Sequence, residues 1–331
     1  MRYFTLKTRI MLKNYLRFNW SYRKIGKEIG KSISSISAEI NKNGGRKAYN
    51  AWQAEANAEE RLRVRGKRRK LDISKGLKKY VIEMLKKDWS PEQVSGELKR
   101  LAKGKSVLSH ETIYQFIYSK EGKLLRLWKH LRHRHKYLQA KRRSWNGRKK
   151  RGHIIKNRVS IHKRPMEIEK NQYGEIESFG HWEADLMVFS KSKYALAVFV
   201  ERKTKQTYSF VNTDKTSSQM KMALHGFVEQ AGIENIKTIT FDNGLENVCH
   251  EEIRKEYNYS FDTYFCDPYC SWQKGLVENT NKLIRQYFPR KIAHEDISQD
   301  KLDVTVSMLN NRPRKTLQFN TPNHHFDSCS F

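Results

Sequence analysis

The spacing of apolar residues changes once along the chain. Up to about residue 160, apolar positions recur three or four residues apart, which is typical of amphipathic helices. Beyond that point, short runs of β-branched and aromatic residues alternate with helical stretches. The pattern therefore predicts a helical N-terminal half followed by an α/β domain.

Two short helices are predicted near the N-terminus. Residues 21–30 form the first, which Gly30 ends, and residues 31–40 form the second, which Ser32 caps. The inward positions of the two helices are expected to be Ile25, Ile29, Ile33, Ile36 and Ile40. Two helices joined by a glycine turn are typical of a DNA-binding helix-turn-helix, although an ordinary helical hairpin has the same pattern. Base contacts of a helix-turn-helix come from the start of its second helix, here Ser34, Ser35 and Ser37.

The same arrangement recurs further along the chain. Ser90, Pro91 and Gln93 have the types and spacing of an N-cap, a first helical residue and the closing residue of a capping box. Residues 110–118 predict the second helix of this pair. The apolar face of the first helix is expected at Val94, Leu98 and Leu101. The base-contacting residues of the second helix are expected to be His110, Thr112 and Gln115.

The C-terminal half predicts a β-sheet covered by helices. Three consecutive strands are expected first, and helices and strands then alternate. The strands are predicted at residues 181–189, 195–200, 207–211, 238–241 and 261–265. The helices are predicted at residues 217–230, 251–257 and 276–287. This order of elements predicts a mixed sheet with helices on its faces.

The distribution of charge indicates a partner. The chain has a formal net charge of +31, and residues 1–160 contain 44 Lys and Arg against 12 Asp and Glu, whereas the rest of the chain contains 22 and 23. The excess positive charge therefore lies in the helical half, where it attracts a polyanion and releases its counterions. Nucleic acid is the leading partner, although a ribosomal or membrane-surface protein can be equally basic.

Two stretches concentrate this charge. Residues 61–70 contain seven Lys and Arg in ten positions, and residues 132–158 are basic as well. So many like charges repel one another unless a polyanion lies alongside, so we expect linkers that also follow phosphates. In the first stretch, the phosphate contacts are expected from Arg65, Arg68 and Arg69.

Cysteine usage and hydropathy indicate the compartment. None of the four cysteines belongs to a Cys-x-x-Cys pair, which favours reduced thiols in an intracellular protein. The sequence has no signal-peptide pattern and no apolar stretch of about 20 residues, the length that a membrane span needs. We therefore expect a soluble protein of the cytoplasm.

Three acidic residues stand where a metal site needs them. Asp185 lies within the first predicted strand, Asp242 directly follows the strand at 238–241, and Glu278 lies in the last predicted helix. A carboxylate among apolar neighbours is costly to bury unless it is paired or binds a metal, whereas an exposed strand-end acid is the alternative for any one of them. Two divalent ions held by carboxylates suit phosphoryl transfer, and Mg²⁺ needs few protein ligands because it keeps several waters.

Residues around these acids have supporting roles in this interpretation. Glu183 shares a strand face with Asp185 and is expected to act behind it, and Asp267 is a candidate for a spare ligand or a loop cap. Trp272 is expected in the core, although shaping the entry to the site, together with Gly275, is the alternative. On the helix, a polar and basic stripe follows the acid at three, four and seven positions, and its basic members are expected to hold the DNA backbone. The stripe consists of Asn281, Lys282 and Arg285.

Several segments resemble one known family. Residues 180–185 (GHWEAD), 240–244 (TFDNG) and 267–281 (DPYCSWQKGLVENTN), with 285–289 (RQYFP), are similar to the three catalytic blocks of the IS30 family of insertion-sequence transposases. The WSPEQ segment from Trp89 and the SHETIY segment from Ser109 resemble the second DNA-binding region of that family. The resemblance covers nearly the whole chain.

The resemblance implies a DDE transposase of the bacterial cytoplasm, associated with the nucleoid. Its catalytic triad would be Asp185, Asp242 and Glu278, with 35 residues between the last two and Arg285 as the basic residue seven positions after the glutamate. These carboxylates would hold two Mg²⁺ ions, for which Mn²⁺ substitutes. The implied partners are double-stranded DNA, as terminal inverted repeats and as target, and further copies of the chain in a dimeric or larger synaptic complex.

The expected fold is an α/β, ribonuclease-H-like and integrase-like catalytic domain with a mixed sheet, preceded by all-α helix-turn-helix domains. The domains are expected at residues 1–60 and 76–131 (helix-turn-helix), 61–75 and 132–165 (basic linkers) and 166–331 (catalytic). The helical half and the catalytic half, divided near residue 160, are expected to separate in solution. Two rival functions share these features: a transcription regulator with an inactive catalytic domain, and a structure-specific nuclease that cleaves without joining.

Overall fold

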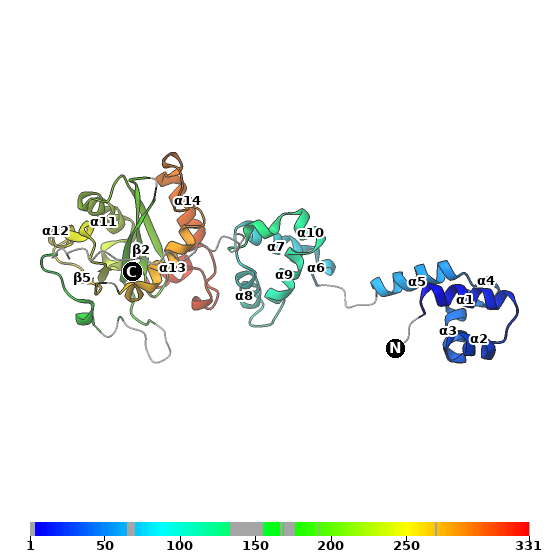
Figure 1. The fold of residues 1–331 in the computed structure, drawn as a ribbon. Coiled ribbons are helices and arrows are strands. Elements are labelled where there is room, and N and C mark those ends of the chain that lie inside the picture. The colour runs from blue at the N-terminus through cyan, green and yellow to red at the C-terminus, as the bar shows by residue number, and fades with distance from the viewer. Residues whose placement is uncertain are drawn as a thin grey trace. The chain divides into compact units, whose positions relative to one another are not determined.

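The chain divides into two compact units, Met1–Ser74 and Lys75–Phe331 (Figure 1). The structure is a computed structural model, and it describes residues 4–64, 70–132, 155–165, 168, 176–190, 192–268 and 270–330. Within these ranges, no helix combines the length and the hydrophobicity that crossing a membrane requires.

The first unit is entirely helical in its described residues. Helices α1 (Leu6–Arg17) and α5 (Ala51–Val64) pack against each other. Helices α2 (Tyr22–Ile29) and α3 (Ile33–Lys42) form the predicted pair. The remaining two helices are short: α4 (Gly45–Ala48) and α6 (Lys70–Ile73).

The stop of α2 and the cap of α3 are confirmed. Gly30 ends α2 in the left-handed conformation, with φ of 66°, and the Ser32 hydroxyl accepts a hydrogen bond from the Ser35 N–H. One predicted inward position is wrong, because Ile33 is 47% exposed: it is the first residue of α3 and extends beyond the end of the core. The positions that do form the fully buried centre are Ile25, Ile36 and Ile40.

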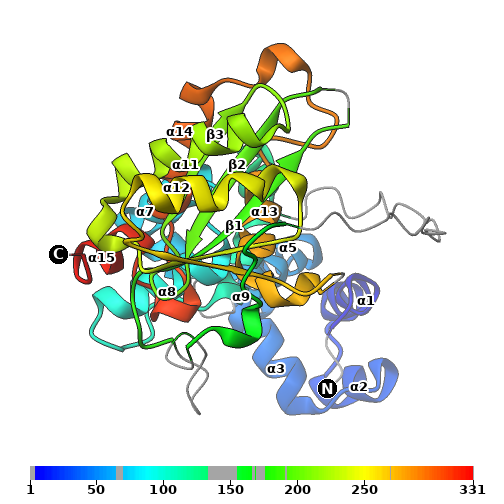
Figure 2. The ribbon, with the colours of Figure 1, turned by 90° about the vertical axis from the view of Figure 1, so that its left-hand side faces the viewer.

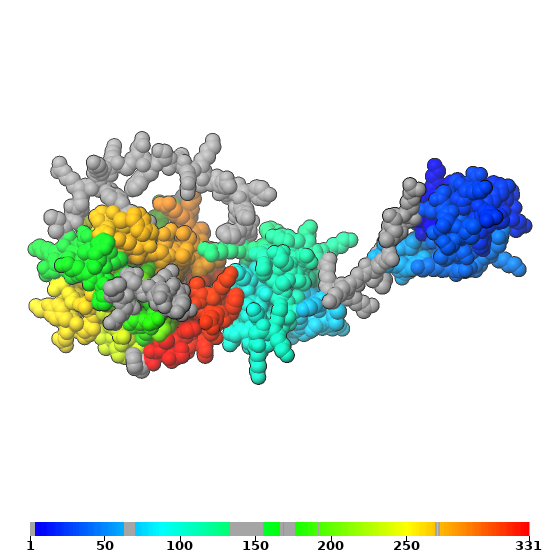
Figure 3. All heavy atoms as spheres, turned by 90° about the horizontal axis from the view of Figure 1, so that it is seen from below, coloured from blue at the N-terminus to red at the C-terminus, as the bar shows by residue number. Residues whose placement is uncertain are grey.

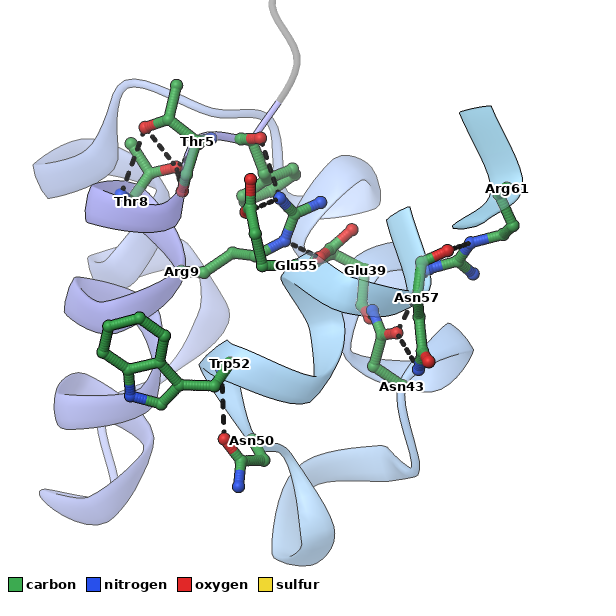
Figure 4. A network of polar contacts seen from close by, with 11 residues as sticks. Thr5, Thr8, Arg9, Glu39, Asn43, Asn50, Trp52, Glu55, Asn57 and Arg61 are labelled. Atoms are coloured by element: carbon green, nitrogen blue, oxygen red, sulfur yellow. Dashed lines mark hydrogen bonds and ion pairs between the residues drawn. The ribbon is translucent and has the colours of Figure 1, made fainter. Parts of the chain in front are cut away.

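A buried arginine joins three helices of this unit (Figure 4). Arg9 on α1 donates a hydrogen bond through Nε to Glu39 on α3 at 2.7 Å, and its guanidinium also contacts Glu55 on α5. Its Nη1 donates to the carbonyl oxygen of Phe4 at 2.9 Å. Because a buried charge is stable only with its partners in place, this link fixes the rotation of α3. It holds the residues at the start of α3 toward solvent.

The first basic stretch begins inside a helix. Residues 61–64 continue α5, and Arg61 donates hydrogen bonds to the carbonyl oxygen of Asn57 at 2.8 Å and to Oδ1 of Asn43 at 3.2 Å (Figure 4). The linker predicted from residue 61 therefore starts later than expected. Arg65, Arg68 and Arg69 lie outside the described residues, as does most of the second basic linker.

The second unit begins with four helices, α7 (Lys75–Lys86), α8 (Pro91–Leu101), α9 (His110–Ile117) and α10 (Lys120–Leu124). The capping box of α8 is confirmed: the Ser90 hydroxyl accepts from the Gln93 N–H at 3.2 Å, and the Ser90 N–H donates to Gln93 Oε1 at 2.8 Å. Val94 and Leu98 are buried, but Leu101 is 59% exposed, contrary to the prediction, because it is the last residue of α8 and lies past the packed face.

A five-stranded mixed sheet forms the centre of the C-terminal domain (Figure 2). The strand order is β3-β2-β1-β4-β5, in which β1, β2 and β3 pair antiparallel and β4 pairs parallel with both β1 and β5. This is the sheet of the expected ribonuclease-H-like fold. The strands are β1 (His181–Val188), β2 (Ala195–Glu201), β3 (Thr207–Asn212), β4 (Thr238–Phe241) and β5 (Asp262–Phe265).

Helices cover both faces of the sheet (Figure 2). Helices α11 (Ser217–Ala231) and α12 (His250–Glu256) pack with α15 (Pro322–Asp327) on the core that contains Trp182 and Phe199. Helices α13 (Gly275–Ile284) and α14 (Gln299–Asn310) pack on the other core. Because side chains alternate along a strand, Trp182 and Ala184 of β1 face α11, whereas residues 183, 185 and 187 face α13.

The C-terminal segment joins the helical part of this unit to the catalytic domain. Figure 3 shows this segment in red against the helical residues in cyan and teal. The ring of Phe319 lies so close to Gly96 on α8 that an added Cβ would come within 2.1 Å of it. Gln93 Nε2 donates to the carbonyl oxygen of Pro313 at 2.8 Å. These contacts place the second helical domain in the compact unit that starts at Lys75, and the expected separation of the two halves in solution near residue 160 stays a prediction.

A buried histidine at the start of β1 makes the stability of the domain depend on pH. His181 is 5% exposed, and its ring nitrogens contact the hydroxyls of Thr238 at 2.9 Å and Ser178 at 2.8 Å. Burial, and then the charges of Lys237 and two arginines, lower the pKa of His181 to about 4. The unfolded chain therefore binds this proton first as the pH falls through about 6.5.

We expect this imidazole to reduce the free energy of unfolding between about pH 6.5 and 4, by up to about 3 kcal/mol at the lower limit. The measurement is urea unfolding of the full chain and of His181→Gln across this range. The stability difference between the two proteins should change with pH in this interval and stay constant above pH 7. A constant difference throughout would contradict the assignment.

Candidate active site

Asp185 and Asp242 lie beside each other on neighbouring strands. β1 and β4 pair parallel with Glu183 opposite Thr240, and the same register two residues further on brings Asp185 level with Asp242. Asp185 lies within β1, and Asp242 is the first residue after β4. The pairing of the strands therefore creates a position flanked by two carboxylates.

The third acid comes from the helix that covers this part of the sheet. Glu278 lies in the first turn of α13, whose Val277 and Ile284 pack into the core on β1 and β2. Asp185, Asp242 and Glu278 line one cavity of about 460 Å³. Over the described residues, no three carboxylate, imidazole or thiol groups meet closely enough to bind a single ion. The three acids thus share a cavity without converging on one point.

A lysine that the sequence analysis did not single out lies between the two aspartates. Lys274 is 6% exposed, and its Nζ donates to Asp185 Oδ1 at 3.0 Å and to the carbonyl oxygen of Ala184 at 2.8 Å. The same Nζ is 3.7 Å from Asp242 Oδ2. Burial acts to lower the pKa of Lys274, but the charges of Asp185 and Asp242 outweigh it and raise that pKa above its ordinary value. The lysine is therefore a fixed positive charge in the site.

Two residues of the predicted stripe on α13 also contact the carboxylates. Asn281 Nδ2 donates to Asp185 Oδ2 at 2.7 Å, so both oxygens of Asp185 accept hydrogen bonds. Lys282 Nζ lies 2.9 Å from Glu278 Oε1, one helical turn away, and both side chains are about half exposed. An exposed pair of this kind contributes little to stability, so Lys282 remains available to an incoming anion.

Glu183 anchors the helix that carries the third acid. One oxygen of this buried carboxylate accepts hydrogen bonds from the backbone N–H groups of Leu276 at 3.1 Å and Val277 at 3.0 Å. The other oxygen pairs with the guanidinium of Arg202 at 3.3 Å. A carboxylate at a helix N-terminus satisfies unpaired N–H groups and interacts favourably with the helix dipole. Glu183 therefore acts behind Asp185, as expected, by holding α13 on β1.

Asp267 caps the loop before α13 instead of facing the other acids directly. Its N–H donates to Gln273 Oε1 at 2.7 Å, and its Oδ2 accepts from Gln273 Nε2 at 2.9 Å and contacts His162 Nε2 at 2.6 Å. Hydrogen bonds from Gln273 and His162 lower the pKa of Asp267. Of the two roles predicted for it, the loop cap is the one that these contacts support, although the residue also lines the cavity.

The loop after β4 contains a further acid near the two aspartates, which the sequence analysis missed. Asn247 Nδ2 donates to Asp242 Oδ1 at 2.8 Å, and the Gly244 N–H donates to the same oxygen at 3.3 Å. Glu246 lies in this loop, and burial, followed by the charges of Asp242 and Asp185, raises its pKa. Glu246 follows Asp242 by four residues within a turn, and this spacing matches no pattern that predicts a site from sequence.

Arg285 joins the end of α13 to the end of β1. It is the C-cap residue of α13, which is shorter than the predicted helix. Its Nη2 donates to the carbonyl oxygen of Val188 at 2.6 Å, and the guanidinium lies over the ring of Phe189 at 5.0 Å from the centroid. Burial, and then the charge of Arg290, lower the pKa of Arg285. These contacts give the residue a structural part beside its predicted part in DNA binding.

We expect Arg285→Ala to lower the free energy of unfolding by about 1.5 to 3 kcal/mol, the range for hydrogen bonds to charged groups. Arg285→Lys should recover part of this loss because it keeps the charge but not the planar fork. Urea unfolding of the full chain measures both, and Arg290→Ala, which removes an exposed arginine nearby, is the control. Wild-type stability of Arg285→Ala would show that the contacts are incidental.

The predicted base-contacting residues lie on the second helix of each pair, most of them in its first half. Ser34 and Ser35 are exposed in the first turn of α3, and Ser37 is half-buried. In α9, His110 and Gln115 are exposed. Thr112 is half-buried, and its hydroxyl contacts that of Ser109 at 2.9 Å. Both helices therefore present polar residues at the end where a recognition helix meets bases.

Trp272 is not in the core. Its side chain is 72% exposed, which corrects the prediction, because the short helical turn that contains it lies outside the layer of α13 on the sheet. It lines a second cavity, of about 850 Å³, together with Arg164, Arg202 and Arg314. Burial, and then the charges of Arg312 and Arg132, lower the pKa of Arg314 to about 10.

The mixed sheet and the helices on its faces form a ribonuclease-H-like domain, and the relatives of the chain identify a nucleotidyl-transfer enzyme. The chain is 38% identical over 323 residues to the transposase InsI of insertion sequence element IS30C from Escherichia coli (strain K12), covering 96% of this chain and 82% of that protein. It is 32% identical over 329 residues to the transposase of IS4351 from Bacteroides fragilis, covering 98% and 95%. The chain belongs to the IS30 family of insertion-sequence transposases.

Two other comparisons complete this result. No protein-family model matches the chain. The catalytic core domain of BIV integrase aligns with 46% of this chain and 95% of its own length, at 17% identity and a TM-score of 0.37.

Proposed function

We propose that this protein cleaves DNA strands at the ends of an insertion sequence and joins them to target DNA, with divalent metal ions held by Asp185, Asp242 and Glu278. One observation carries the proposal: the β1–β4 register sets the two aspartates beside each other, and Glu278 lines the same cavity. The family of the chain supports the choice of DNA ends as substrate.

The donor set of the cavity fits a hard divalent cation. Carboxylate oxygens are the ligands that Mg²⁺ prefers, and Mn²⁺ accepts the same set. The Lys274 ammonium between Asp185 and Asp242 supports this fit, because it shows a cation stabilised by both carboxylates. Two bound ions would supply activation of a water or 3′-hydroxyl and stabilisation of the leaving oxygen. We therefore propose Asp185, Asp242 and Glu278 as the metal ligands.

The residues around the triad prepare it for this chemistry. Asn281 holds one oxygen of Asp185, and Asn247 holds one oxygen of Asp242, so each aspartate keeps a fixed orientation. Glu183 fixes α13 and with it the position of Glu278. Lys282 and Arg285 follow on α13, where we propose that they contact the DNA backbone beside the cleaved bond.

Recognition of the DNA ends is assigned to the two helix-turn-helix domains. We propose that Ser34, Ser35 and Ser37 on α3 read bases, as do His110, Thr112 and Gln115 on α9. Arg65, Arg68 and Arg69 would follow phosphates without reading sequence. The partners would be double-stranded DNA, as terminal inverted repeats and as target, and at least a second copy of the chain in the synaptic complex. The working compartment would be the bacterial cytoplasm, at the nucleoid.

The test is an assay of the full chain with Mg²⁺ on a duplex that ends in the terminal inverted repeat of the element. We expect nicking at the end and joining of the end to a plasmid, and neither reaction on a duplex with a scrambled end. Cleavage without joining would instead identify a nuclease. Specific binding without cleavage would identify a regulator with an inactive catalytic domain.

A further inference from the structure

The Lys274 ammonium occupies the position between the two aspartates that a metal ion would need. Its side chain is 7% exposed, and its Nζ lies 3.0 Å from Asp185 Oδ1 and 3.7 Å from Asp242 Oδ2. The carbonyl oxygen of Ala184 accepts a further hydrogen bond at 2.8 Å. The two aspartates thus already share a cation, which the chain itself supplies.

A metal ion and this ammonium exclude each other. Both are stabilised by the same carboxylate oxygens, and two positive charges within a few ångströms repel strongly in a partly buried site. A divalent ion placed between Asp185 and Asp242 therefore requires the ammonium to leave. Breaking the contacts of the ammonium costs free energy, and this cost weakens metal binding by the same amount.

The local structure allows Lys274 to leave without moving the helix. Lys274 is the last residue of a short turn, Ser271–Lys274, and the N-cap of α13. The N-terminus of α13 is held separately, by the Glu183 carboxylate on Leu276 and Val277. The lysine side chain can therefore swing out of the cavity while Glu278 keeps its place.

We propose that Lys274 is an internal counter-ion that competes with divalent metal for Asp185 and Asp242, and so keeps metal affinity low. The inference rests on the metal site of the proposed function. In the free protein the lysine offsets one of the two negative charges of the aspartates and stabilises the fold of the site. The side chain of Lys274 withdraws when metal binds. The free energy that this withdrawal costs makes the metal affinity lower than the carboxylates alone would give.

Lys221 provides a control outside the cavity. It lies on α11, on the other face of the sheet, and its Nζ pairs with Glu252 at 3.4 Å and with Glu256 at 2.6 Å. Its side chain is 28% exposed, and none of these three residues belongs to the proposed metal or DNA sites. Removing the charge of Lys221 therefore tests the general effect of one fewer cation on the protein, whereas removing that of Lys274 tests competition for the oxygens of the two aspartates.

The experiment measures Mn²⁺ binding to the full chain without DNA, by electron paramagnetic resonance of free Mn²⁺. The variants are Lys274→Met, Lys274→Gln and Lys221→Gln, with Asp185→Asn and Asp242→Asn. We expect Lys274→Met and Lys274→Gln to bind Mn²⁺ at least about tenfold more tightly than wild type, because a repelling charge is gone. Lys221→Gln should change the affinity less than about threefold, because its charge lies outside the cavity. The two Asn variants should bind more weakly than wild type.

A second measurement uses the wild-type chain and does not depend on the folding of any variant. An amine-acylating reagent followed by mass spectrometry reports the exposure of each lysine with and without Mg²⁺. Lys274, buried in the free protein, should react several-fold faster when Mg²⁺ is added, whereas Lys221 serves as the internal reference.

The outcomes separate this inference from the proposal on which it rests. Unchanged or weaker Mn²⁺ binding by the Lys274 variants, or an unchanged reactivity of Lys274 in Mg²⁺, would overturn the competition. An equal gain in affinity from Lys221→Gln would overturn it as well, since the effect would then be one of total charge. Wild-type Mn²⁺ binding by Asp185→Asn and Asp242→Asn would show instead that the metal site itself is assigned wrongly.

Discussion

Asp185→Asn, Asp242→Asn and Glu278→Gln are each expected to lower the rate of Mg²⁺-dependent cleavage by at least about a thousandfold, because each removes a metal ligand and with it transition-state stabilisation. Each substitution keeps the size of the side chain, removes its charge and replaces one acceptor oxygen by a donor amide group. The predicted DNA-reading residues lie on α3 and α9, so binding to the element end should stay within about threefold of wild type. Cleavage of a labelled end duplex and gel-shift titration of the same duplex measure the two quantities.

A surface carboxylate is the control for this series. Glu252 on α12 has a side chain 71% exposed and pairs with Lys221, on the face of the sheet that α13 does not cover. Glu252→Gln should cleave at the wild-type rate. A triad variant that cleaves as fast as wild type would remove its residue from the site, and equal losses from Glu252→Gln would indicate a general effect of charge.

Glu183→Gln is expected to lower the free energy of unfolding by about 3 to 5 kcal/mol, the range for breaking a buried ion pair. The substitution removes the charge that faces Arg202 and that stabilises the first turn of α13. Urea unfolding of the full chain, followed by near-ultraviolet circular dichroism, measures the loss. Cleavage by this variant should fall because less of the protein is folded, and replacing Mg²⁺ with Mn²⁺ should restore little of the activity.

Glu278→Gln is the matched control for stability. It alters a carboxylate on the same helix, but one whose partner is an exposed lysine, so the change in unfolding free energy should stay below about 1 kcal/mol. The two variants thus separate the roles of the two glutamates: one holds the helix, and the other acts from it. A loss from Glu183→Gln no larger than that from Glu278→Gln would show that other contacts fix α13.

The two glutamates also show why burial decides the role of an acid here. Glu183 is 3% exposed, has each of its oxygens engaged by groups of the chain and does not line the cavity of the three acids, so it is not placed to bind a metal there. Glu278, half exposed at the cavity, is the one free to turn toward an ion. Asp185 is intermediate between the two glutamates, because its oxygens accept hydrogen bonds from Lys274 and Asn281.

The sequence by itself determined the helices and strands, and the positions of the three acids on them. Caps such as Ser32 and Ser90, the stop at Gly30 and the alternating strands act within a few residues, so their physics can be read locally. The two aspartates and Glu278 were found in the same way, from their places in a strand, after a strand and in a helix. The motifs around them resembled one family, to which the chain belongs.

Only the tertiary structure decided what depends on residues distant in the chain. Lys274 becomes a counter-ion because a parallel pairing of β1 with β4 brings two aspartates to it, 89 residues away in the case of Asp185. Phe319 reaches Gly96 and so joins the second helical domain to the catalytic one, across the boundary that charge alone indicated. The spacing of apolar residues shows that one face of a helix or strand is buried, but not which distant side chain packs against it. Ion pairs and contacts between domains depend on such distant side chains.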